Sequence, residues 1–196
     1  MNLIEETAIP SGAIPLEPFR AHLRMGTGFG EDSLQDVVLE SYLRAAIATI
    51  ESRTGKILVS RDFALEILRW RDPVAQVLPV APVREITGLF AVDGTGAETA
   101  VADGWWLARD AQRPALRATG ACLPAVPVRG SVKIRLVAGM ADTLGDLPAD
   151  LVQAVFLLAA HYYEYRDDTA LSAGCMPFGV TSLMARYVTP RLSGGV

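Results

Sequence analysis

The chain has 196 residues, of which 51% are hydrophobic and 20% are charged, and its formal net charge is −4. This composition is typical of a globular chain with a sizeable core. It disfavours a disordered protein and a protein that grips DNA phosphates through a basic face. The longest apolar stretch, Leu151 to Ala160, is about half as long as a membrane span and predicts a buried helix. The first residues lack the pattern of a signal peptide, so we expect a cytoplasmic protein with no membrane contact.

Helices are predicted first along the chain, over residues 16–55, after an N-terminal extension, residues 1–15, to which no structure is assigned. Phe19 and Leu23 are spaced i, i+4 in a short predicted helix from Leu16 to Arg24, which Gly26 would end. A longer helix is predicted from Ser33 to Thr54, where Asp36 completes a capping-box-like start and Gly55 supplies the end. Its apolar stripe is expected at Leu34, Val37, Val38, Ala45 and Ile50.

Residues 56–140 form a predicted β-rich insertion. Apolar alternation and strand-favouring residues indicate strands at 63–68, 85–92, 105–107 and 132–136. Asp93-Gly94 predicts a tight turn between two of them. Short strands separated by turn residues indicate a small antiparallel sandwich or an open barrel.

Helices return over residues 147–187. Pro148 suits the first position of a helix, Asp150 suits the first turn, and the helix is expected to run to about Arg166. A last short helix is predicted near Val180 to Tyr187, followed by a tail over 188–196. The fold class is therefore α+β: one domain in which a bundle of about four helices carries a small antiparallel β-sandwich between its second and third helices.

Reactive groups do not form a recognisable catalytic or metal-binding pattern. His22 and His161 lack a second histidine or cysteine at helical spacing, which argues against a zinc site. The glycines at 26, 28 and 30 do not follow a predicted strand and do not match a phosphate-binding motif. Cys122 and Cys175 are expected to be free thiols, and nothing in the sequence activates Cys175 with His161 as a nucleophile pair. We predict no cofactor, no metal and no enzymatic activity.

Acidic pairs and aromatic residues leave two further hypotheses open. Glu5-Glu6, Glu31-Asp32 and Asp167-Asp168 are expected to be solvated, but a hydrolase could use such a pair, or Cys175. Trp105 and Trp106 point to opposite faces of one strand, and either could be the platform of a β-sandwich module that binds a ligand or carbohydrate. The tyrosines at 162, 163 and 165 are expected to pack in the core or at an interface.

Taken in order, five segments resemble one family, the head–tail connector (adaptor) proteins of tailed phages and gene transfer agents. Leu16 to Arg24 resembles the family's L-x-x-x-K-x-H-L-R helix, and Ile50 to Lys56 resembles its E-x-x-T-G-R exit into the first strand. Pro79 to Val83 is similar to the step between two prolines that precedes a strand. Leu147 to Arg166 resembles the P-x-x-L-x-x-A-I-L-L-L-x-x-H-W/Y-Y-E-x-R helix, and Pro177 to Tyr187 resembles the P-x-G-x-x-x-L-L-x-x-Y/F ending. Each motif is mostly capping and core residues, and the ordered set carries the resemblance.

The resemblance implies a non-enzymatic virion structural protein that forms a ring of about twelve copies on the portal. Such a ring links the capsid to the tail, presents a platform to a stopper or tail-terminator protein, and lets DNA pass through its channel without sequence-specific binding. The protein would be present in the host cytoplasm during assembly and then at the particle neck. The resemblance places candidate portal contacts at Pro177, Phe178, Gly179, Leu183, Arg186, Tyr187, Pro190, Arg191 and Leu192. For Phe178, Leu183 and Tyr187, packing against the long helix is an equally open alternative.

Overall fold

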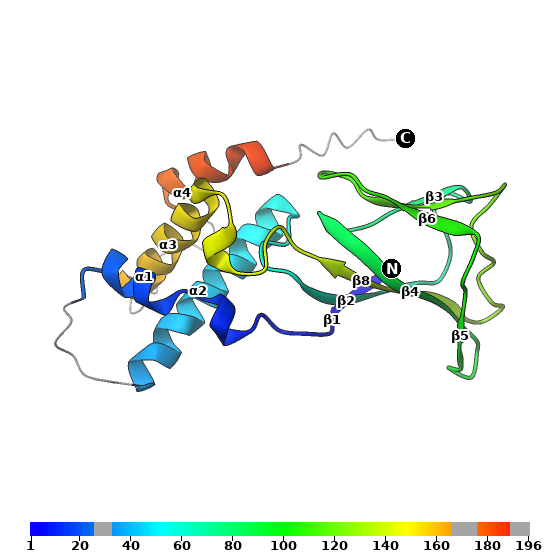
Figure 1. Cartoon of the computed structure of the whole chain (residues 1–196), viewed down its shortest axis with the longest axis horizontal. Coiled ribbons are helices and arrows are strands. Elements are labelled where there is room, and N and C mark those ends of the chain that lie inside the picture. Colours follow the sequence, from blue (N-terminus) through cyan, green and yellow to red (C-terminus); the bar gives the residue numbers. More distant parts are fainter. Residues whose placement is uncertain (26–32, 166–175, 189–196) are drawn as a thin grey trace. The chain divides into compact units, whose positions relative to one another are not determined.

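The computed structural model describes residues 1–25, 33–165 and 176–188. It confirms an α+β fold, with helices and two antiparallel sheets (Figure 1). The helices are α1 (Leu16–His22), α2 (Ser33–Thr54), α3 (Ala149–Glu164) and α4 (Phe178–Met184), with 3-10 turns η1 (Ser11–Ala13), η2 (Leu144–Asp146) and η3 (Ala185–Tyr187). The strands are β1 (Asn2–Glu5), β2 (Arg61–Ile67), β3 (Ala75–Val77), β4 (Val83–Val92), β5 (Glu98–Ala100), β6 (Trp105–Ala108), β7 (Ala115–Ala118) and β8 (Ser131–Ala138).

Two compact units make up the described chain. Met1–Ile9 and Val59–Met140 form the strand unit, and Pro10–Leu58 with Ala141–Val196 forms the helix unit. The strand unit lies between the second and third helices in sequence, as predicted, except that β1 comes from the N-terminal extension to which the sequence assigned no structure. None of the described helices combines the length and the apolar composition that a membrane span requires.

The larger sheet of the strand unit has the order β1-β2-β8-β4-β5, and all of its pairs are antiparallel. Val132, Ile134 and Leu136 of β8 are buried, whereas Lys133 and Arg135 between them are half-buried, so the predicted alternation is confirmed. Phe63, Leu65 and Ile67 of β2 are buried on the same side as these β8 residues. This inner face forms much of the unit's core.

The smaller sheet has the order β3-β7-β6 and forms the second layer of the strand unit (Figure 1). Leu116 of β7 and Gln76 of β3 are buried on one of its faces, whereas Trp106 of β6, on the other face, is 48% exposed. Arg109 Nε donates to the carbonyl of Arg84, 3.1 Å away, and thereby links the end of β6 to β4. Two antiparallel layers with buried inner faces agree with the predicted sandwich.

An ion pair fixes β1 on the edge of the larger sheet. Arg61 is buried, and its Nε and Nη2 lie 2.9 and 3.2 Å from the two carboxylate oxygens of Glu5. Arg61 also donates from Nη1 to the carbonyl of Val59 at 3.1 Å and stands over the Phe63 ring. A buried guanidinium needs such partners because its desolvation is costly. Glu5 therefore has a structural role at this edge of the sheet.

In the helix unit, α3 contacts both α2 and α4 (Figure 1). Its buried residues are Leu151, Ala154, Val155, Phe156, Leu158 and Ala159, which confirms the predicted buried helix. Phe19 of α1 is fully buried, and its ring centroid lies 5.6 Å from that of Phe156. The sequence placed Pro148 at the first helical position, but its ψ of 137° is extended, and Pro148 is the residue before the helix.

The predicted stripe of α2 was mostly wrong. Val37 is 67% exposed, Val38 is 42% exposed, and Ala45 is also exposed, whereas Ile50 is buried as expected. The buried positions are Leu39, Leu43, Ala46, Ile47 and Ile50. Apolar residues occur on several sides of this helix, so its own sequence did not show which side meets its neighbours. The predicted end is confirmed, since Gly55 has φ +69° and its N–H donates to the carbonyl of Glu51 at 2.8 Å.

We predict that Ile134→Ala lowers the free energy of unfolding by about 2–5 kcal/mol, because this fully buried side chain leaves a cavity at the centre of β8. Val128→Ala is the matched control, since Val128 is 91% exposed and its truncation should change stability by less than about 0.5 kcal/mol. Urea unfolding midpoints of the two variants check this, and equal midpoints would contradict the assignment of the core.

Candidate functional site

The candidate site is the segment formed by α4 and η3, because most of the predicted contact residues lie there. Val180 and Met184 are spaced i, i+4, are buried, and hold α4 against α3. The sequence reasoning did not select these two residues, although their spacing is the usual signal of a helix with one buried face. Gly179 lies next to α3: a Cβ at this position would sit 3.8 Å from Leu157 Cδ1, an ordinary contact.

Phe178 stands at the start of α4 and is 89% exposed. The alternative that it packs against the long helix is therefore wrong for Phe178. Pro177 and Leu183 are half-buried, which leaves part of each side chain available to a partner. The exposed ring of Phe178 is available as an anchor for a partner, because an aromatic side chain buries a large apolar area when it is covered. Pro190, Arg191 and Leu192 lie outside the described residues.

Asp150, Arg186 and Tyr187 form a polar cluster that joins η3 to the first turn of α3. Arg186 Nε and Nη2 lie 2.9 and 3.2 Å from the two carboxylate oxygens of Asp150. The Tyr187 hydroxyl donates to Asp150 Oδ1 at 2.9 Å and accepts a hydrogen bond from Arg186. The Arg186 guanidinium also stands 4.7 Å from the centroid of the Tyr187 ring. These contacts fix the two side chains that follow α4.

Burial raises the pKa of the Tyr187 phenol, and its bond to Asp150 raises it further. The phenol therefore keeps its proton at neutral pH and remains a donor to the carboxylate. The side chain of Arg186 is 65% exposed and keeps a solvent-facing surface while it is paired. Phe178 at the start of α4 and Arg186 and Tyr187 after its end thus belong to one short segment, and contacts with Asp150 hold the last two side chains in place.

The two histidines and the two cysteines were the other candidates for a reactive or metal-binding site. His22 packs its ring against Phe156, with centroids 5.6 Å apart, and His161 lies 4.7 Å from the Tyr165 ring. Cys122 is an exposed free thiol, and Cys175 lies outside the described residues. Within residues 1–25, 33–165 and 176–188, no three histidine, cysteine or acidic side chains come together as a metal site would require.

The tyrosines of α3 connect it to α2. The Tyr162 hydroxyl lies 3.1 Å from Thr49 Oγ1, and the Tyr163 ring meets the Tyr42 ring edge-on at 6.1 Å between centroids. Tyr165 is 48% exposed at the end of the helix. Helix packing accounts for Tyr162 and Tyr163, in line with the core role expected for them.

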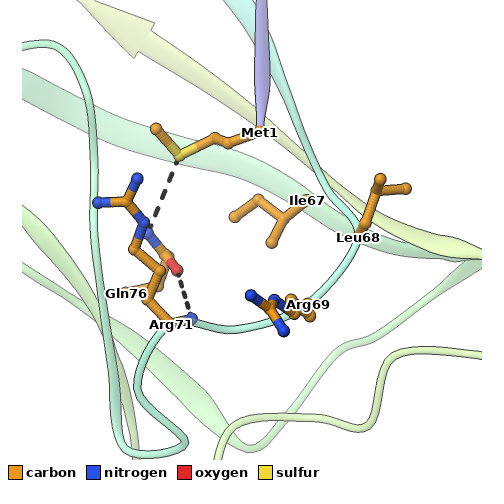
Figure 2. Close-up of a pocket in the computed structure, with 6 residues that line it drawn as sticks. All are labelled: Met1, Ile67, Leu68, Arg69, Arg71 and Gln76. Atoms are coloured by element: carbon orange, nitrogen blue, oxygen red, sulfur yellow. Dashed lines mark hydrogen bonds between the residues drawn. The ribbon is translucent and has the colours of Figure 1, made fainter.

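A cavity of about 400 Å³ opens in the strand unit (Figure 2). It is lined by Met1, Ile67, Leu68, Arg69, Arg71 and Gln76. Figure 2 shows Gln76 reaching toward Met1, and its Oε1 accepts a hydrogen bond from the backbone N–H of Arg71 at 3.2 Å. Neither tryptophan that the sequence suggested as a binding platform lines this cavity: Trp105 Nε1 donates to the carbonyl of Val101 at 3.0 Å, and Trp106 faces solvent.

Solved structures of gene transfer agent (GTA) particles contain chains that match the whole of this one. The neck of an empty GTA particle, computed with C6 symmetry, includes a chain 52% identical, with a TM-score of 0.91, covering 100% of this chain and 99% of that one. The neck of a native GTA particle, computed with C12 symmetry, includes a chain 49% identical with a TM-score of 0.85 and the same coverage. A chain in the virion of a native GTA particle is 51% identical with a TM-score of 0.87, again covering 100% and 99%.

The α+β fold and its full-length likeness to these structures define a structural component of a particle neck. The chain belongs to the gene transfer agent head–tail connector family. No protein-family model and no curated protein matches the sequence. The similarity favours a structural role over the ligand-binding and hydrolase hypotheses, because the matched chains are parts of particle necks and virions.

We predict that Tyr187→Phe weakens the docking of η3 on α3 by about 1 kcal/mol, because the variant loses the hydrogen bond to Asp150. Hydrogen exchange of the α4–η3 amides should become faster while the amides of α3 keep their protection. Tyr165→Phe is the matched control. Unchanged exchange over 178–187 would show that the cluster does not hold the segment.

Proposed function

We propose that this chain is the adaptor subunit that links the capsid of a gene transfer agent or phage particle to its tail. The observation that carries the proposal is the full-length match, at 49–52% identity, to chains of solved GTA necks and a GTA virion. Copies of the chain form a ring on the portal protein, and the ring's other side receives a stopper or tail-terminator protein. The role is structural, and no step of it needs a reactive side chain.

A ring of twelve copies is supported by the symmetry of the matched necks. One neck was computed with C12 symmetry and the other with C6, and a ring of twelve is compatible with both. Copies in such a ring are related by rotation, so one surface of each copy contacts a different surface of the next. This head-to-tail contact closes into a ring when the rotation angle divides the circle evenly. Subunits are made in the cytoplasm of the host and join the neck during assembly.

The portal contact is the segment that begins at Pro177. Val180 and Met184 are buried and hold α4 in place. The backbone that carries Phe178 is therefore already ordered, and a partner that covers this side chain does not have to order the helix first. Arg186 and Tyr187 extend this surface, since both are held by Asp150. The candidate portal contacts are Pro177, Phe178, Gly179, Leu183, Arg186 and Tyr187, continued by Pro190, Arg191 and Leu192.

DNA passes through the ring without being read. The formal net charge of −4 supports this, because a chain with more carboxylates than cations gains little from binding phosphates. A passage that repels DNA weakly lets it move in either direction, whereas a basic lining would retain it.

We predict that Phe178→Ala lowers attachment of the ring to the portal at least tenfold, the effect of losing about 1.4 kcal/mol or more at a buried aromatic contact. Thr181→Ala is the matched control, since Thr181 is exposed on the same helix. Both variants should fold equally well, because Phe178 is not part of the core. The measurement is the amount of the chain in purified particles, and full incorporation of the Phe178 variant would contradict the assigned contact.

Removal of residues 190–196 should leave the domain folded and weaken portal attachment. Helix content by circular dichroism reports the fold, and the fraction of capsids that carry tails reports the attachment. Tailed particles at the normal frequency would exclude a docking role for this segment.

A further inference from the structure

The two sheets of the strand unit have outer faces that point away from each other, because their inner faces are buried together. We name the outer face of the smaller sheet the tryptophan face. The strand register places on it Ala75, Val77, Trp106, Ala108, Ala115 and Arg117. Trp106 lies directly opposite Arg117 on the neighbouring strand.

The tryptophan face combines exposed apolar surface with an unmatched positive charge. Trp106 is 48% exposed and Val77 is 43% exposed. Arg117 is exposed, and its guanidinium has no carboxylate partner among the described residues. None of the six residues of this face is acidic. Tryptophan and arginine are the residue types most enriched at the energetic centres of protein interfaces.

We name the outer face of the larger sheet the acidic face. On it, carboxylates outnumber cations: the register and the side-chain contacts place there Glu6, Asp62, Glu66, Glu85 and Glu98 with Lys133 and Arg135. Ile4, which is 48% exposed, and the half-buried Phe90 add apolar surface.

Both cations of the acidic face are already engaged within it. Lys133 pairs with Glu98, and Arg135 lies 3.4 Å from Glu98 and 3.8 Å from Glu6. Arg135 also stands over the Phe90 ring, 4.9 Å from its centroid. The carboxylates of Asp62, Glu66 and Glu85 are not paired with either cation, so the face has a net negative charge. Its charge is opposite to that of the tryptophan face.

We propose that the tryptophan face of one copy docks on the acidic face of the next copy in the ring. Arg117 would then meet carboxylates, and Trp106 and Val77 would cover Ile4 and Phe90. The two faces are different surfaces on opposite sides of one unit, so the contact is head-to-tail and repeats around a closed ring. A contact between two tryptophan faces would instead bring two Arg117 side chains together, which is electrostatically unfavourable. This interface rests on the proposed ring.

A cross-linking experiment in purified particles tests the interface. Ala75→Cys on the tryptophan face and Asn2→Cys on the acidic face are introduced together into a chain in which Cys122 and Cys175 are replaced by serine. A short bismaleimide should convert this double variant into a ladder that extends beyond dimers. Each single-cysteine chain is the matched control and should stay monomeric, because equal faces do not meet.

Two results would overturn the proposed interface: monomers from the double variant when the particles contain the normal amount of the chain, or dimers from the Ala75→Cys chain alone. As a second measurement, Arg117→Glu should lower incorporation about tenfold, whereas Arg113→Glu, an exposed loop variant, should not. Incorporation of Arg117→Glu at the wild-type level would also contradict the interface. Absence of the wild-type chain from the neck would instead refute the proposed function, so the two failures are distinguishable.

Discussion

The burial of α3 is the interaction on which the helix unit depends. Phe19 of α1 reaches Phe156 of this helix, and α2 and α4 pack against other sides of it. Only Val180 and Met184 of α4 are buried, so α4 has a defined position because α3 provides an apolar surface to receive it. Once α4 is placed, its other side chains cannot enter the core, and Phe178 is left in water. The same packing therefore accounts for both the stability of the unit and its exposed aromatic residue.

Charged side chains in this protein organise structure and present surfaces. Glu5 compensates the buried Arg61, Glu40 accepts hydrogen bonds from Arg44, and Asp150 positions Arg186. Among the described residues, none of these groups belongs to a cluster that could hold a metal ion. Membership of a neck-protein family fits this pattern, since a connector works through surfaces that complement other proteins. The proposals assign the α4–η3 segment of the helix unit to the portal, and the two outer sheet faces of the strand unit to neighbouring copies.

Sequence patterns predicted the elements whose signals are local. The helix from Ser33 to Thr54 and the buried side of β8 were correct, because capping residues and alternation over several residues identify them. Strands β1, β3, β5 and β7 were missed, because each has only three or four residues, too few for an alternating pattern to show. Strand β1 also pairs only with β2, which is distant in sequence. The exposure of Val37 and of Phe178 could not be predicted from the sequence, since it depends on which side of each helix meets α3. The family resemblance identified the C-terminal segment, but the structure was needed to separate its anchors from its exposed residues.

The central claim is that this chain forms the ring between portal and tail. Electron cryo-microscopy of intact particles that carry this chain tests it most directly, with the neck reconstructed and the chain traced into the density. The account predicts a twelve-membered ring at the junction of capsid and tail, with the segment from Pro177 onward against the portal. Density for this chain at any other position in the particle, or a ring that does not touch the portal, would contradict it.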